Sequence, residues 1–178
     1  MNNQKSFTLI EILVYIAVLA IITVAISSFF LWFIHSNTKA RAMRETLDNT
    51  RRAMEIMTYE TKEAKSIYTP TTTSTQLSLE TTKYLPEEEK TTYIDFYLCG
   101  TQLCFKREPA SSIATSSKPV ALTSNKVEVK NLVFSQIATT STNPSVQINL
   151  KISYKNPADR PEYRASVNLI STASLRSY

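Results

Sequence analysis

The most apolar stretch of the chain lies close to its N-terminus. From Ile12 to Ile34 no residue is charged, and most are aliphatic or aromatic. As a helix, with a rise of about 1.5 Å per residue, this stretch would be about 34 Å long, enough to cross the ~30 Å hydrocarbon core of a bilayer once. The pattern therefore predicts a single transmembrane helix, which we place at residues 7–34.

The helical pattern continues after the apolar run but becomes one-sided. Neither Gly nor Pro occurs between Phe7 and Thr69, so we expect one helix of about sixty residues. Its second part, 35–69, is predicted to be amphipathic, because apolar and small residues recur there at alternating steps of three and four. The members of this stripe are Ala40, Met43, Leu47, Thr50, Met54, Met57, Thr61, Ala64 and Tyr68.

Two partners fit this stripe. The strict spacing of three and four residues suits a two-stranded coiled coil. It suits equally a helix that packs on the domain that follows it in the same chain, and that domain needs a cover for one face of its sheet. We favour packing within the chain.

After Pro70 polar and apolar residues alternate with the period of two that is typical of β-strands. The clearest case is SVQINLKISY at 145–154, and EYRASVNLIS at 162–171 repeats the alternation after a loop suited to a hairpin. The segment TTYIDFYLCGTQLCFKRE, 91–108, alternates in the same way and turns at Gly100.

Two weaker strands are expected at 76–82 and 126–134. In the second, the alternation slips between Val129 and Leu132, as it does at a β-bulge. The fold class is therefore α+β: a long N-terminal helix packed on an antiparallel β-sheet formed by residues 70–178.

Residue types on which catalysis and cofactor binding depend are scarce. The chain has one Gly and one His, His35, which excludes Gly-rich phosphate loops, His-based catalytic arrangements and multi-His metal sites. The segment PEEEK, Pro86–Lys90, has three consecutive carboxylates, which rarely converge on one cation, and we interpret it as a solvated loop. We expect no enzyme activity, no catalytic residue, no cofactor and no metal.

The net charge of +5 is scattered along the chain and does not require a nucleic-acid or lipid partner. Around the apolar run, however, the charges are unequal. Lys5 precedes it, whereas Lys39, Arg41, Arg44, Arg51 and Arg52 follow it. By the positive-inside rule alone, the large C-terminal part would lie in the cytoplasm.

The two cysteines, Cys99 and Cys104, lie on one face of the hairpin predicted around Gly100. A four-residue loop, 100–103, would set them directly opposite each other. A two-residue loop would pair Cys99 with Gln102 and leave the thiols diagonal, too far apart to bridge. We expect the four-residue loop and a disulfide, which persists only in an oxidising compartment.

One acid, Glu11, stands at the head of the apolar run, and the next formally charged residue is Lys39. An ionised carboxylate near the centre of a bilayer costs roughly 2.5–3.5 kcal/mol. A residue placed there at such a cost is expected to have a partner and a function.

The segment around this acid, FTLIEILVYIAVLAIITVAI at 7–26, resembles the N-terminal motif of the type IV filament superfamily, the type IV pilins and type II secretion pseudopilins. The resemblance implies a cytoplasmic leader at 1–6, which a prepilin peptidase removes between Ser6 and Phe7. The same enzyme would then methylate the Phe7 amine. The family normally has Gly before the cut, where this chain has Ser6.

The resemblance also gives Glu11 a partner. In a filament it would accept the N-terminal ammonium group of a neighbouring subunit, because a buried pair of charges is tolerable where either charge alone is not. The implied partners are other pilin or pseudopilin subunits, the inner-membrane assembly platform and the lipid bilayer. The implied topology places the C-terminal domain outside the cytoplasm, against the charge bias, and finally in a pilus or pseudopilus.

Within the superfamily the chain is most similar to minor subunits. VEVKNLVFSQI at 127–137, the segment at 145–154 and STASLRSY at 171–178 resemble J-type pseudopilins and W-type minor pilins. The unbroken helix also favours a minor subunit, placed at the tip of the filament.

Two alternatives remain. A competence-type pilin would contact DNA phosphates through basic groups, but the aromatic and basic residues do not alternate beyond ordinary strand composition. The second alternative is an unprocessed, single-pass membrane-anchored binding protein, which the residue Ser6 allows. The basic groups available for DNA are Lys106, Arg107, Lys151, Lys155, Arg160 and Arg164.

We predict that the mature chain begins at Phe7 and is N-methylated there. N-terminal mass analysis of the membrane-extracted protein checks this, and Ser6→Gly should be processed equally well or better. Chains that begin only at Met1 or Asn2, in cells whose prepilin peptidase cleaves other substrates, would contradict the prediction.

Overall fold

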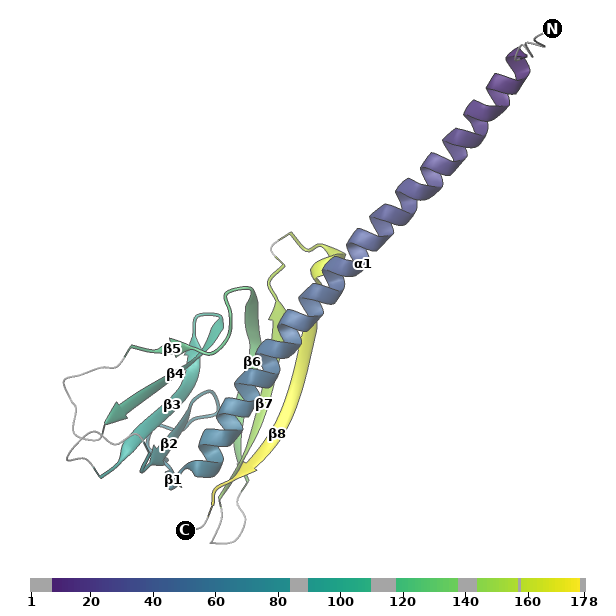
Figure 1. The fold of residues 1–178 in the computed structure, drawn as a ribbon. Coiled ribbons are helices and arrows are strands. Elements are labelled where there is room, and N and C mark those ends of the chain that lie inside the picture. Colours follow the sequence, from purple (N-terminus) through teal and green to yellow (C-terminus); the bar gives the residue numbers. More distant parts are fainter. Residues whose placement is uncertain (1–7, 84–89, 110–117, 138–143, 157, 177–178) are drawn as a thin grey trace.

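The computed structural model describes residues 8–83, 90–109, 118–137, 144–156 and 158–176. A single long helix runs diagonally through the molecule, and its N-terminal half projects away from a β-domain that packs along the other half (Figure 1). This is the α+β arrangement that the sequence predicts, with the helix against antiparallel sheets.

The helix α1 (Leu9–Glu63) begins after Thr8, whose carbonyl oxygen accepts hydrogen bonds from the amides of Glu11 and Ile12. It ends earlier than the predicted Thr69. Ala64 is extended, and the next residues pair with a strand instead of continuing the helix, since the Lys65 amide donates to the carbonyl of Glu80. Competition from this sheet edge, which residue composition does not reveal, ends the helix.

The strands form two antiparallel sheets instead of one. The order is β1-β2-β3-β4-β5 in the first sheet and β6-β7-β8 in the second. A short 3-10 helix, η1 (Pro161–Tyr163), lies in the connection between β7 and β8. The strands are β1 (Ser66–Ile67), β2 (Leu77–Thr81), β3 (Thr92–Cys99), β4 (Gln102–Pro109), β5 (Val120–Ala121), β6 (Val127–Ile137), β7 (Ser145–Tyr154) and β8 (Ser166–Ser174).

Most of the predicted strands are confirmed. In β7 the alternation holds as expected, with Val146 to Ile152 fully buried at every second position, and β6 has an irregular register between Val129 and Asn131. The last strand begins at Ser166, later than its pattern suggested, because Tyr163 belongs to η1. The short strands β1 and β5 were not predicted; two residues are too few to show a period.

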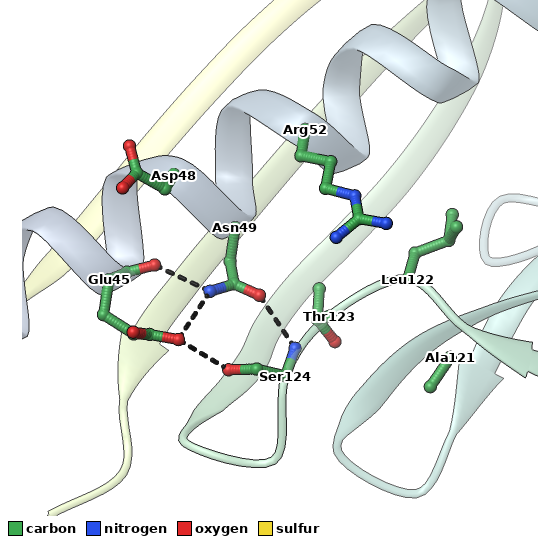
Figure 2. A pocket seen from close by; sticks show the side chains of 8 residues that line it. All are labelled: Glu45, Asp48, Asn49, Arg52, Ala121, Leu122, Thr123 and Ser124. Carbon is green, nitrogen blue, oxygen red and sulfur yellow. Dashed lines mark hydrogen bonds between the residues drawn. The ribbon is translucent and has the colours of Figure 1, made fainter.

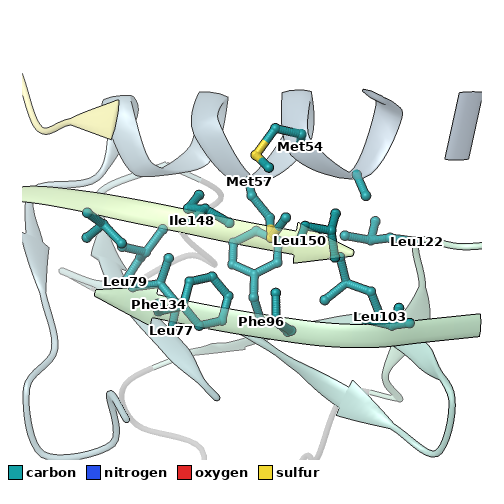
Figure 3. Packing of buried hydrophobic residues seen from close by; sticks show 14 of the residues in the cluster. Met54, Met57, Leu77, Leu79, Phe96, Leu103, Leu122, Phe134, Ile148 and Leu150 are labelled. Carbon is teal, nitrogen blue, oxygen red and sulfur yellow. The ribbon is translucent and has the colours of Figure 1, made fainter. Parts of the chain in front are cut away.

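One hydrophobic core joins α1 to both sheets. The helix packs mainly along β7 and β8, and Met57 points from it toward Phe96 of β3, between Ile148 and Leu150 of β7 (Figure 3). All four of these side chains are fully buried. Packing within the chain, which we favoured for the amphipathic stripe, is therefore confirmed from Thr50 onward.

The first part of the stripe was assigned to the wrong face. Ala42 and Thr46 are buried, whereas Met43 is 46% exposed and Ala40 is also exposed. The hydroxyl of Thr46 donates to the carbonyl of Ala42 at 2.8 Å, and a hydroxyl satisfied within its own helix can be buried at little cost. The small side chains of Ala42 and Thr46 therefore face the sheet. The prediction from hydrophobicity alone had placed Met43 there.

We predict that Met57→Ala lowers the free energy of unfolding of the β-domain by about 2–5 kcal/mol, because it leaves a cavity in a fully buried site. The exposed Met43 is the matched control, and Met43→Ala should change the free energy of unfolding by less than about 0.5 kcal/mol. Denaturant unfolding of the full-length protein in detergent measures both. Equal losses in the two variants would mean that the buried face is misassigned.

Candidate functional site

The first half of α1 is not covered by its own domain. Among the described residues this is the one helix long and apolar enough to cross a membrane, and none of its most apolar window is buried within the molecule. Leu9, Leu19 and Phe29 lie on different sides of the helix, and each is more than 60% exposed. The whole circumference is therefore available to lipid or to other helices.

Glu11 lies in the first turn of this bare helix. The Tyr15 hydroxyl donates a hydrogen bond to its Oε1 at 3.3 Å, and the N-terminal end of the helix dipole favours a negative charge there. The next basic side chain along the described helix is Lys39, 28 residues away (39 minus 11) and so about 42 Å along the axis. No cation on the described part of α1 is therefore within reach of Glu11. Ser6 and Phe7, the predicted cleavage and methylation residues, lie outside the described residues.

Cys99 and Cys104 form a disulfide, but the predicted four-residue loop is wrong. Cys99 pairs with Gln102, so the turn has two residues and the cysteines are diagonal neighbours. Their Cα atoms are 5.9 Å apart, within the range that a disulfide spans, because strand twist draws one diagonal of a hairpin together. Gly100 has a φ of 67°, the left-handed conformation that tight hairpin turns require and glycine adopts readily.

The six basic residues of the DNA-binding alternative come from three separate parts of the fold. Lys106 and Arg107 lie on β4 of the five-stranded sheet and Lys151 on β7 of the other, and the remaining three lie in the β7–β8 connection.

Three of the six are held by carboxylates of the same chain. Lys106 pairs with Glu108, and this hydrogen bond raises the pKa of Lys106. The Arg107 guanidinium lies 3.4 Å from a carboxylate oxygen of Glu60, a buried residue of α1. Arg164 donates two hydrogen bonds to Asp159. Phosphate contacts by these residues would compete with existing ion pairs.

A polar contact that the sequence did not reveal attaches the β5–β6 loop to α1 (Figure 2). The Ser124 amide donates to Oδ1 of Asn49 at 2.7 Å, and the Ser124 hydroxyl donates to Oε1 of Glu45 at 3.0 Å. A cavity of about 280 Å³ lies beside these groups. The signal in the sequence is a pair of polar residues four apart, which is too common on helices to indicate a contact.

Among the described residues, no group of three or more His, Cys, Asp or Glu side chains could hold a metal ion. The acidic segment 86–89 lies outside them. Burial raises the pKa of Asp95, the largest effect on that carboxyl, but Asp95 lies on a sheet strand beside Lys106 and is distant in sequence from the apolar helix.

The comparisons with known proteins bear on the N-terminal helix alone. Residues 1–27 match the family described as the prokaryotic N-terminal methylation motif. The match supports a type IV pilin-like protein. No curated protein and no solved structure matches the chain.

The pilin-like motif and the bare helix coincide, since residues 8–27 of the match lie in the uncovered half of α1 and its cap. The motif belongs to a structural family, and the apolar helix fits a membrane-anchored pilin. Tyr15 is the one residue of this site that the sequence analysis missed. Its spacing of four from Glu11 places both on one helix face, which was the available signal.

We predict that Cys99 and Cys104 are linked in the protein isolated from cells. Peptide mapping without reductant should recover the two cysteines in one cross-linked species, and the same digest with reductant serves as the control. The double substitution Cys99→Ser/Cys104→Ser should lower the free energy of unfolding by about 2 kcal/mol in the chain-entropy estimate for so short a loop. Thiols that alkylate freely in protein from an oxidising compartment would contradict the prediction.

Proposed function

We propose that the protein is a minor pilin or pseudopilin, a structural subunit that primes assembly at the tip of a type IV pilus or a type II secretion pseudopilus. The observation that carries the proposal is a helix with the methylation motif at its start and an apolar surface that its own domain leaves uncovered. Such a surface is stable in lipid, and it is equally stable among the helices of other subunits.

Glu11 determines how neighbouring subunits would align along this apolar surface. A carboxylate in hydrocarbon is costly, and the first lysine of the described helix lies too far away to neutralise it. The methylated amine of Phe7 on a neighbouring subunit is a cation that can enter the same apolar core. Pairing the two removes the cost that each charge carries alone, so Glu11 favours the filament over the membrane.

Cleavage and topology follow from the same proposal. The leader 1–6 stays in the cytoplasm, where the prepilin peptidase and methyltransferase act on Ser6 and Phe7, and the β-domain emerges on the other side. A disulfide between Cys99 and Cys104 supports this, because such a bond persists in an oxidising compartment. The inner-membrane assembly platform then transfers the subunit from bilayer to filament.

Two features support a minor subunit over a major one: the resemblance of C-terminal segments and the unbroken helix. The strands β6 and β7 and the C-terminal segment 171–178 resemble minor subunits in sequence, and the helix runs from Leu9 to Glu63 without a break.

We predict that Glu11→Gln sharply reduces incorporation into filaments and leaves the β-domain folded. Glutamine preserves size and hydrogen bonding but removes the charge, and the variant costs less to keep in lipid. It should accumulate as a cleaved membrane monomer. Co-purification with sheared filaments, detected by immunoblotting, measures incorporation.

Two control variants isolate the charge. Glu55→Gln makes the same change at an exposed position of α1 within the β-domain and should assemble normally. Tyr15→Phe removes the hydroxyl that donates to Glu11 but keeps the carboxylate, so its effect should be smaller than that of Glu11→Gln. Wild-type incorporation of Glu11→Gln would show that the ion pair between subunits is wrong.

A further inference from the structure

The β-domain first approaches α1 at the point where the apolar run ends, around His35. A cavity of about 480 Å³ lies between α1 and η1. On the helix side it is lined by Trp32, His35, Ser36 and Lys39. Across it, Nδ1 of His35 lies 3.9 Å from a carboxylate oxygen of Glu162. The β7–β8 connection, 155–165, is therefore the part of the domain packed on the helix closest to the apolar run (Figure 1).

This contact fixes the depth of the connection. With Ile12–Ile34 in the hydrocarbon, His35 and Lys39 lie in the layer of lipid headgroups, which is about 5–8 Å thick on each side of the bilayer. Trp32, 66% exposed, then lies at the boundary where Trp side chains are enriched. Because η1 packs on these residues, the connection reaches the same layer.

The described residues of this connection, 155–156 and 158–165, contact one another and the end of β7. Tyr154 and Tyr163 stack with ring centroids 5.7 Å apart. The Asn156 side chain donates to the carbonyl of Arg160 at 2.8 Å and accepts from its amide at 2.9 Å. The Asn156 side chain therefore holds the backbone of Arg160, beside a cavity of about 310 Å³ that Lys155 and Arg160 line.

Among the described residues of this region, three cations have no carboxylate partner, and they outnumber its two acids, Asp159 and Glu162. Asp159 binds Arg164, and Glu162 faces His35. Within the described ranges no carboxylate forms an ion pair with Lys39, Lys155 or Arg160, and Lys39 and Arg160 are exposed. Positive charge is thus left uncompensated at the depth where lipid phosphates lie.

We propose that the β7–β8 connection, together with Lys39, binds the phosphates of anionic lipid headgroups on the membrane face from which the domain emerges. Basic residues close to an anionic surface attract it within a Debye length, about 8 Å at physiological salt. The contact holds the domain upright on the membrane before assembly. This inference depends on α1 spanning the membrane, which is part of the proposed function, and not on filament formation.

A fluorescent probe on the connection tests the proposal. The full-length oxidised protein carries the label at Ala158→Cys, or at the control position Thr172→Cys on β8, both exposed. It is placed in nanodiscs that contain a lipid with a nitroxide on its headgroup. The nanodiscs consist of phosphatidylcholine alone or of phosphatidylcholine with phosphatidylglycerol.

We expect strong quenching at Ala158→Cys, greater with phosphatidylglycerol and reduced by high salt, and weak quenching at Thr172→Cys, which lies about 20 Å further along β8 from its first residue. Lys155→Gln/Arg160→Gln should lower the ratio of docked to undocked domain about fivefold for each charge removed. The matched control is Arg51→Gln/Lys62→Gln, two exposed cations further along α1, which should leave the quenching unchanged.

Three outcomes would overturn the proposal. They differ in whether the proposed membrane topology fails as well. Equal quenching at Ala158→Cys in both lipid mixtures would show that the connection does not prefer anionic headgroups. Quenching at Thr172→Cys as strong as at Ala158→Cys would mean that α1 does not place the domain as described, and the proposed topology would fail too. Loss of filament incorporation in Lys155→Gln/Arg160→Gln with unchanged quenching would assign the connection to contacts between subunits.

Discussion

Burial of one face of α1 against the two sheets determines where every other part of the molecule lies. Between Ala42 and Thr61 the helix contributes small residues and two methionines to a core that includes strands of both sheets. Leu9 lies 33 residues before Ala42 (42 minus 9), about 50 Å along the axis. A domain anchored at this distance cannot shield the start of the helix, so that segment must find its apolar surroundings elsewhere.

The unbroken helix also couples the two ends of the molecule. In its apolar half the hydroxyls of Thr23, Ser27 and Ser28 donate to carbonyls of the same helix, so they add no polar group that lipid or a neighbouring helix must satisfy. Without a Gly or Pro at which to bend, movement of Glu11 along the axis moves the β-domain by the same amount. The separation between Glu11 and the β-domain along the helix axis is therefore fixed.

Polar contacts along α1 hold the domain to this helix, and three of them lie far apart from one another. The first is η1 beside His35, the second is the β5–β6 loop at Glu45 and Asn49, and the third is Glu63, which contacts Lys83 at 2.9 Å and Arg176 at 3.1 Å. The hydrogen bond from Lys83 lowers the pKa of Glu63. Hydrogen bonds with Tyr59 and, to a smaller extent, with Glu63 raise the pKa of Lys83. These contacts orient the sheets around a helix whose apolar packing alone would permit some rotation.

The sequence by itself determined the features that depend on local order along the chain: the apolar run, the isolated Glu11, the alternation of β7 and the bulge in β6. Only the tertiary structure decided where α1 ends, which of its faces is buried between Ala42 and Leu47, how the strands divide into two sheets, and how Cys99 meets Cys104 across a two-residue turn. Each of these outcomes depends on competition with, or twist of, a segment distant in the sequence. A periodic pattern records which residues avoid water, but it does not record which partner covers them.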